Sequence, residues 1–124
     1  QNIYRLLKKD GIFIFELPAF QSLYDSYDSE LQHFRRYNKS NILKKLKSEN
    51  FLILDIHYIC YSIFLPFLLV KLFNKVFRKK SVLKNNFKLS DNSLITIMLQ
   101  QEMKLIDIIK LPFGIRIFGI SRKK

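Results

Sequence analysis

The sequence predicts an α/β fold that contains two parallel strands of one sheet. Two short apolar runs, Ile12–Leu17 and Phe51–Tyr58, have the composition of buried strands. Between them, residues 39–49 carry the apolar spacing of a helix. A strand, a helix and a second strand in this order form a βαβ unit, whose right-handed crossover builds a parallel sheet.

Composition sets the limits of this prediction. A length of 124 residues fits one domain or one part of a larger domain. The hydrophobic fraction of 48% and the 12 phenylalanines argue against disorder. The single cysteine, Cys60, excludes an internal disulfide, suits the reducing cytoplasm, and is read as a small buried apolar side chain. The two histidines, His33 and His57, have no metal-ligand spacing, so we expect no metal site, and His57 is read as structural.

The first element is a short helix over residues 3–7 that ends at Asp10-Gly11, with Gly11 suited to a left-handed cap. It has fewer than three turns and no N-cap, and the chain starts at Gln1 rather than Met. We therefore expect residues to be missing upstream. The near-continuous apolar run Ile12–Leu17 predicts a strand covered on both faces, and Pro18 ends it.

The helix between the two strands has clear end signals. Asn38 is a suitable N-cap for a helix over Lys39–Glu49, and Asn50 tolerates the left-handed conformation that ends helices. The second strand, Phe51–Tyr58, follows at once. The apolar stripe that should face the sheet consists of Ile42, Leu43 and Leu46.

The next segment has a different character. Residues 63–70 are apolar on every side, and beyond them two helix faces separate. This apolar stretch is shorter than the ~20 residues that a bilayer span needs. Two interpretations stay open: an interfacial or partner-facing helix, or a helix that covers the protein's own core. The predicted apolar face holds Leu69, Leu72, Phe73, Val76 and Phe77, and the polar face holds Lys71, Asn74, Lys75 and Arg78.

The chain then continues through a basic loop, Lys80–Lys88, and several N-cap candidates at residues 90–93. A helix over Leu94–Ile109 should follow, broken by Pro112 and Gly114. Its predicted inward residues are Leu94, Ile95, Met98, Leu99, Leu105, Ile106 and Ile109. Residues 115–121 predict a third strand, and residues 122–124 a frayed basic end.

Charge is high and uneven along the chain. The formal net charge is +12, and no acidic residue occurs from Ile56 to Ser90. Such a tract attracts anions in general, namely phospholipid, nucleic acid or a phosphorylated substrate, unless it is simply a solvated face. The basic residues of this tract are Lys71, Lys75, Arg78, Lys79, Lys80, Lys84 and Lys88.

The loop after the first strand holds the candidate site. Residues 19–37 are rich in aromatic and polar side chains, with one helical turn expected around residues 22–27. Loops at the carboxyl ends of strands are where open α/β sheets usually build ligand sites. The chemistry-bearing side chains here are Asp28, His33, Arg35, Arg36 and Tyr37.

These motifs resemble the C-terminal half of class I S-adenosylmethionine-dependent methyltransferases. In that Rossmann-like family, a segment like Leu6–Gly11 precedes the fifth strand, which ends in Leu-Pro and leads into an aspartate and a Gly-His-x-Arg-Arg-Tyr signature. Asp28 and residues 33–37 match these features, although Gln32 replaces the glycine. Asn50-Phe51 stands where Gly-Phe normally precedes the sixth strand. Recognisable motifs cover residues 4–58 only.

The resemblance implies a fold of about three strands for this chain. The segment 115–121 would be the family's seventh strand, antiparallel and inserted between the other two. Residues 1–124 would form the acceptor-side half of the methyltransferase domain, with residues 59–110 as an apolar and basic helical insertion. The cofactor site for S-adenosylmethionine would lie upstream of residue 1, because Gly11, Gly114 and Gly119 form no clustered loop. These residues alone should therefore neither bind the cofactor nor catalyse.

The resemblance also suggests roles for the loop. His33 is a candidate general base, with Asp28 as its orienting partner. Arg35 and Arg36 are candidate clamps for a carboxylate or phosphate, and Tyr37 a candidate substrate contact. Each has a structural alternative: His33 bonded to a loop carbonyl, Asp28 as a turn former, Tyr37 as a packing residue. Adjacent arginines point apart in most backbones, so one should brace the loop or pair with Glu30.

The leading hypothesis is therefore that the chain is part of a methyltransferase that acts on a small-molecule, lipid or glycan acceptor. It would lie in the cytoplasm, with peripheral membrane contact through residues 64–80 as an option. The alternative is a non-catalytic membrane-surface or anion-binding module. The sequence contains no RNA- or DNA-binding motif, so we do not expect nucleic acid as the partner.

Overall fold

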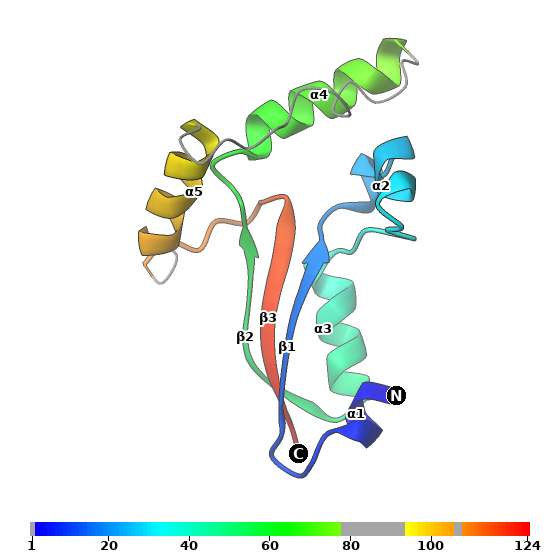
Figure 1. The fold of residues 1–124 in the computed structure, drawn as a ribbon. Coiled ribbons are helices and arrows are strands. Elements are labelled where there is room, and N and C mark those ends of the chain that lie inside the picture. Colours follow the sequence, from blue (N-terminus) through cyan, green and yellow to red (C-terminus); the bar gives the residue numbers. More distant parts are fainter. Residues whose placement is uncertain (1, 78–93, 106–107) are drawn as a thin grey trace.

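The computed structural model describes residues 2–77, 94–105 and 108–124 (Figure 1). It is a mixed α/β structure in which most of the predicted elements are present. In chain order the elements are α1 (Asn2–Leu6), β1 (Ile12–Pro18), the short 3-10 helix η1 (Gln21–Leu23), α2 (Ser26–Glu30), α3 (Lys39–Ser48), β2 (Phe51–Ile59), α4 (Phe64–Phe77), α5 (Leu94–Leu105) and β3 (Arg116–Lys123).

The sheet has three strands in the order β1-β3-β2. The last strand, β3, runs antiparallel to both neighbours, so β1 and β2 run in the same direction. Gly119 pairs with Phe15 on one side and with Ile56 on the other. The predicted α/β class is confirmed, and so are the antiparallel direction of the last strand and its place between the other two.

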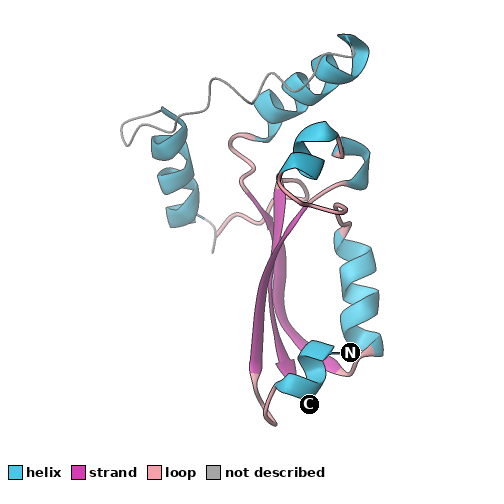
Figure 2. Cartoon of the chain, turned by 45° about the vertical axis from the view of Figure 1, so that its right-hand side comes forward, coloured by secondary structure: helices cyan, strands magenta, loops and turns pink. Residues whose placement is uncertain are grey.

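The core lies between α3 and one face of the sheet (Figure 2). Ile42 and Leu46 of α3 are buried there, and Leu43 packs beside them, as the stripe predicted. Their partners on the sheet include Phe51, Ile56 and Ile117. α3 starts after Asn38, as predicted, and Asn50 has the predicted left-handed backbone with a φ of 61°, but the helix ends at Ser48, one residue before the predicted Glu49. The Asn38 side chain makes no cap hydrogen bond, so its extended backbone alone marks the boundary.

The opposite face of the sheet is open along β1 and the first part of β2 in the described part of the chain. Ile12 and Ile14 of β1 are 44% and 61% exposed, and Leu52 and Leu54 of β2 are 42% and 45% exposed. The prediction that β1 is covered on both faces is therefore wrong for these residues. Side chains alternate along a strand, and α3 packs on one side only, so every second residue of Ile12–Leu17 faces outward.

Two predictions about the residues after α1 and about the C-terminus are also wrong. Asp10, with a φ of 60°, takes the left-handed position expected of Gly11; aspartate is among the few residues that adopt it readily. The C-terminal residues are not frayed, because Arg122 and Lys123 belong to β3. The Lys123 backbone N–H donates to the Gly11 carbonyl at 2.9 Å, and its ammonium donates to the Leu7 carbonyl at 2.8 Å. These bonds tie the C-terminus to the end of α1.

The helices between β2 and β3 differ most from expectation. α5 ends at Leu105 rather than at Ile109, and Leu94 and Met98, predicted inward, are 78% and 42% exposed. Leu105 and Ile109 are exposed as well, whereas Glu102 is buried. Glu102 faces inward because it accepts hydrogen bonds from residues that precede α4. The predicted basic loop, the N-cap candidates at 90–93 and Ile106 lie outside the described residues.

The fold predicts a specific cost for adding one methyl group at Gly119. A Cβ there would lie 2.2 Å from Cζ of Phe15, whose ring covers this position across the strand pair. We expect Gly119→Ala to lower the free energy of unfolding, measured in urea, by about 1–3 kcal/mol. In Phe15→Leu the end of the ring is gone, so the alanine should cost less in that background. If the losses in unfolding free energy from Gly119→Ala and Phe15→Leu simply add in the double variant, this packing is contradicted.

Candidate functional site

The loop that follows β1 begins and ends at the same place. The backbone N–H of Phe20 donates to the Tyr37 carbonyl at 2.9 Å, and that of Tyr37 donates to the Pro18 carbonyl at 2.8 Å. Residues 19–37 therefore form a closed loop on the carboxyl end of the strand, as predicted, and η1 and α2 lie within it. Gln32 has a φ of 58°, a left-handed conformation that explains why glycine suits this position.

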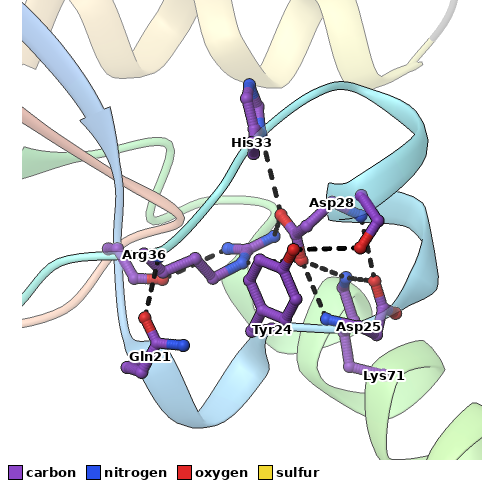
Figure 3. A network of polar contacts seen from close by, with 9 residues as sticks. Gln21, Tyr24, Asp25, Asp28, His33, Arg36 and Lys71 are labelled. Carbon is purple, nitrogen blue, oxygen red and sulfur yellow. Dashed lines mark hydrogen bonds and ion pairs between the residues drawn. The ribbon is translucent and has the colours of Figure 1, made fainter.

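Asp28 is the centre of a buried charge network (Figure 3). Its side chain is fully buried, at 0% exposure. Arg36 approaches it with two nitrogens, Nε at 3.0 Å from Oδ2 and Nη2 at 2.8 Å from Oδ1. Lys71 of α4 donates to the same Oδ2 at 3.2 Å and also pairs with Asp25. One carboxylate thus joins the loop to α4, forty-three residues further along the chain.

Arg36 is the arginine that braces the loop. Besides Asp28, its guanidinium donates to the Ala19 carbonyl at 3.2 Å, and its backbone N–H donates to Gln21 Oε1 at 2.9 Å. It lies over the ring of Phe67, 5.3 Å from the centroid, and is 6% exposed. Of the two alternatives for one arginine, bracing the loop or pairing with Glu30, Arg36 fulfils the first, and these bonds occupy the guanidinium that we expected to clamp a substrate.

The network keeps Asp28 ionised. Burial by itself raises the pKa of this carboxyl group, but the hydrogen bond from Arg36, the backbone N–H of Asp25 and the charges of Arg36 and Lys71 outweigh burial, so its pKa lies below the ordinary 3.8. Asp28 is therefore a fixed negative charge and no proton acceptor near neutral pH.

His33 lies beside this network and is partly open to solvent. Its Nδ1 is 3.7 Å from Asp28 Oδ1, and its side chain is 37% exposed. The backbone N–H of His33 donates to the Asp28 carbonyl at 2.8 Å. Within residues 2–77, 94–105 and 108–124, Nδ1 is buried and has no hydrogen-bond partner. Asp28 thus fixes the position of His33 through the backbone and faces its ring at ion-pair distance.

Arg35 and Tyr37 lie together, apart from the buried network. Nε of Arg35 donates to the Tyr37 hydroxyl at 2.9 Å, and the guanidinium carbon is 5.0 Å from the ring centroid. Both residues line a cavity of about 490 Å³, which Arg36 also borders. The cavity lies beside β1 and α3, and its wall includes Tyr4, Phe15, Asn41 and Lys45. His33 is not part of that wall, so the structure separates it from this arginine–tyrosine pair.

A second polar cluster, at the end of β2, escaped the sequence analysis. Glu102 of α5 is 4% exposed and accepts hydrogen bonds from the backbone N–H groups of Tyr61 and Ser62, at 3.1 and 3.0 Å, and from the Ser62 hydroxyl at 2.6 Å. The sequence did contain a signal for this cluster: Glu102 lies on the stripe of the helix that was predicted to face inward. Burial and the nearby Glu102 charge raise the pKa of the partly buried Cys60 thiol to about 11, so this thiol stays protonated near neutral pH.

His57 is structural, as predicted. It is 7% exposed, and its Nδ1 lies 2.9 Å from Asp55 Oδ2. Lys110 bonds the other oxygen of the same carboxylate at 2.9 Å. Burial alone raises the pKa of Asp55, but the hydrogen bond from Lys110 and the charge of His57 outweigh burial and lower it.

No family model, curated protein or solved structure matches the chain. In the part of the chain that the structure describes, no group of three or more His, Cys, Asp or Glu residues is arranged to hold a metal ion. None of the helices in those same residues has the length and apolar character that a membrane span requires.

The Asp28 network predicts a large stability loss on removal of one charge. Asp28→Asn would leave Arg36 buried without a carboxylate partner and Lys71 with Asp25 alone, so we expect the free energy of unfolding in urea to fall by about 3–5 kcal/mol. Glu16→Gln is the matched control, since Glu16 pairs with Arg116 and both side chains are about half exposed. That control should change stability by no more than about 0.5 kcal/mol. Equal effects of the two variants would show that the buried network does not hold the loop.

The lowered pKa of Asp28 predicts a matching pH dependence. Because the folded chain binds a proton at Asp28 less readily than the unfolded chain does, the stabilisation is present above the ordinary pKa of 3.8 and is lost as the pH falls through the lowered value. Urea unfolding at several values between about pH 5 and pH 2 should show this loss. In Asp28→Asn the slope should be smaller but not zero, because Asp55 also has a lowered pKa. An unchanged slope would contradict the assignment.

Proposed function

We propose that this chain is the acceptor-side part of an S-adenosylmethionine-dependent methyltransferase that acts on a small-molecule, lipid or glycan acceptor. The observation that carries the proposal is the order β1-β3-β2, in which an antiparallel last strand lies between two strands that run in the same direction. The polar loop follows the first of these strands, where an α/β sheet places ligand sites. This combination is the one that the resemblance implies.

The open face of the sheet also supports the proposal. Doubly wound sheets carry helices on both faces, and here Ile12, Ile14, Leu52 and Leu54 are exposed on one of them. In the proposal, the half of the domain that binds S-adenosylmethionine covers this face. The glycines of the chain do not fit a cofactor loop: each is isolated in the sequence, and Gly119 lies inside β3. No catalytic step is therefore assigned to the cofactor's contacts with this chain.

The loop side chains divide into three roles in this proposal. His33 accepts the proton that an acceptor hydroxyl loses on methylation, using Nε2, the ring nitrogen on the side away from Asp28. Asp28 is a positioning residue, because it orients His33 and stays charged. Arg35 binds a carboxylate or phosphate on the acceptor, since its Nε is held by Tyr37 and the residue lines the cavity.

The test requires the protein encoded by the complete gene, with any residues that precede Gln1. It should bind S-adenosylmethionine in calorimetry and transfer tritiated methyl groups from it to small molecules, lipids or glycans of a cell extract. Failure of both measurements would overturn the proposal. The gene sequence gives an independent check: a strand, a Gly-x-Gly-type loop and an acidic residue about twenty positions further on are expected upstream.

His33→Gln in that protein should lower kcat about 100-fold or more and leave the affinity for S-adenosylmethionine unchanged, because general bases contribute in this range. Arg35→Ala should raise KM for the acceptor instead. Lys44→Ala is the control for charge, since Lys44 is an exposed cation of α3 that does not line the cavity. An unchanged kcat in His33→Gln would show that the loop has only a structural role.

A further inference from the structure

In a helix that covers a core, the apolar side of an amphipathic sequence faces inward. In α4 the leucine side faces outward instead. Lys71 points inward and is 5% exposed. Leu65, Leu69 and Leu72 point outward and are 63%, 60% and 49% exposed. These three leucines share one side of the helix, because residues four and seven positions apart do so. We call them the outer face of α4.

Specific contacts fix this orientation. Lys71 is held by Asp28 and Asp25 of the loop after β1. Phe67, one turn before it, packs its ring under the cations of Lys71 and Arg36, at 5.2 and 5.3 Å. Phe64 packs against Phe20 at 5.7 Å and against Phe113 at 5.3 Å between ring centroids. The inner face of α4 is therefore occupied, and the helix cannot turn its leucines inward without breaking the buried ion pairs.

The same reversal occurs in α5. Glu102 is its buried residue, and its carboxylate accepts three hydrogen bonds from Tyr61 and Ser62. Leu94, Ile97 and Met103 of this helix are 78%, 48% and 64% exposed. α4 and α5, both beyond the carboxyl end of β2 (Figure 1), thus each bury one charged side chain and leave several large apolar side chains exposed. Isolated apolar side chains are common on protein surfaces, but three exposed leucines along one side of α4 form a larger apolar surface, which is typical of a binding face.

We propose that the outer face of α4 docks on the surface of an anionic phospholipid membrane. The charge of the chain favours this partner over a protein groove: the net charge is +12, and the sequence has no acidic residue from Ile56 to Ser90. Basic residues at 75, 78, 79, 80, 84 and 88 follow the outer face in the sequence. Apolar side chains that enter the interface and basic residues that attract anionic headgroups are the two contributions to interfacial helix binding.

This docking would give the site a defined position. Lys71 on the inner face ties α4 to the loop after β1, so a membrane bound at the outer face would lie across α4 from that loop. The inference itself depends on the outer face and on charge, and it does not require the methyltransferase proposal. Failure of one would leave the other standing.

The experiment is co-sedimentation of the full chain with large vesicles of two compositions, phosphatidylcholine alone and phosphatidylcholine with an equal amount of phosphatidylglycerol. We expect binding to the anionic vesicles, weakened by added salt. Leu65→Gln combined with Leu69→Gln should reduce that binding at least about tenfold, because the apolar contribution is lost while the charge is kept. Both leucines are exposed, so circular dichroism should show an unchanged fold. Leu6→Gln is the matched control, an 85% exposed leucine on α1 that should bind like the unchanged protein.

Three results would overturn the proposal. Equal binding of the double variant and the unchanged protein would show that charge alone acts. Absence of binding to anionic vesicles would exclude the membrane as the partner. Self-association in light scattering that the double variant abolishes, without vesicle binding, would assign the outer face to a second copy of the chain.

Discussion

Asp28 pairs with two buried cations, Arg36 and Lys71, the second of which also pairs with Asp25, and so joins the loop after β1 to α4. Removing three charged groups from water is costly, and only a compact arrangement with short contacts compensates that cost. The position of each partner is therefore strongly fixed. The closed shape of the loop, the place of His33 beside the carboxylate and the inward turn of Lys71 all depend on this one balance of charge.

The network also decides which side of α4 meets solvent. A helix rich in leucine and phenylalanine would normally bury its apolar side against the sheet. Here Lys71 supplies the inward contact, and Glu102 does the same for α5. The apolar side chains that remain outside are consequently a feature of the folded chain, and they give this region a surface unlike that of α3, whose leucine and isoleucine face the core.

The two halves of the candidate site have different physical characters. Around Asp28 the groups are buried and ion-paired, which suits a rigid support. Arg35 is exposed, Tyr37 is half-buried against the core, and both border a cavity, which suits reversible binding. His33 combines both characters: one ring nitrogen lies near the buried carboxylate, and more than a third of its side chain is exposed. The loop therefore combines a rigid support with side chains that a ligand can reach.

The sequence alone determined the α/β class, the starts of α3 and β2 and their ends to within one residue, and the left-handed Asn50, because these depend on local signals: apolar period, cap residues and backbone preference. It also located the loop that holds His33, Arg35 and Arg36. Only the tertiary structure decided that Arg36 braces the loop, that Arg35 borders the cavity, and that Lys71 and Glu102 point inward. Lys71 and Glu102 meet partners about forty residues away in the sequence, and Arg36 bonds residues 8 to 17 positions before it. No local pattern records which charge a folded chain brings next to another.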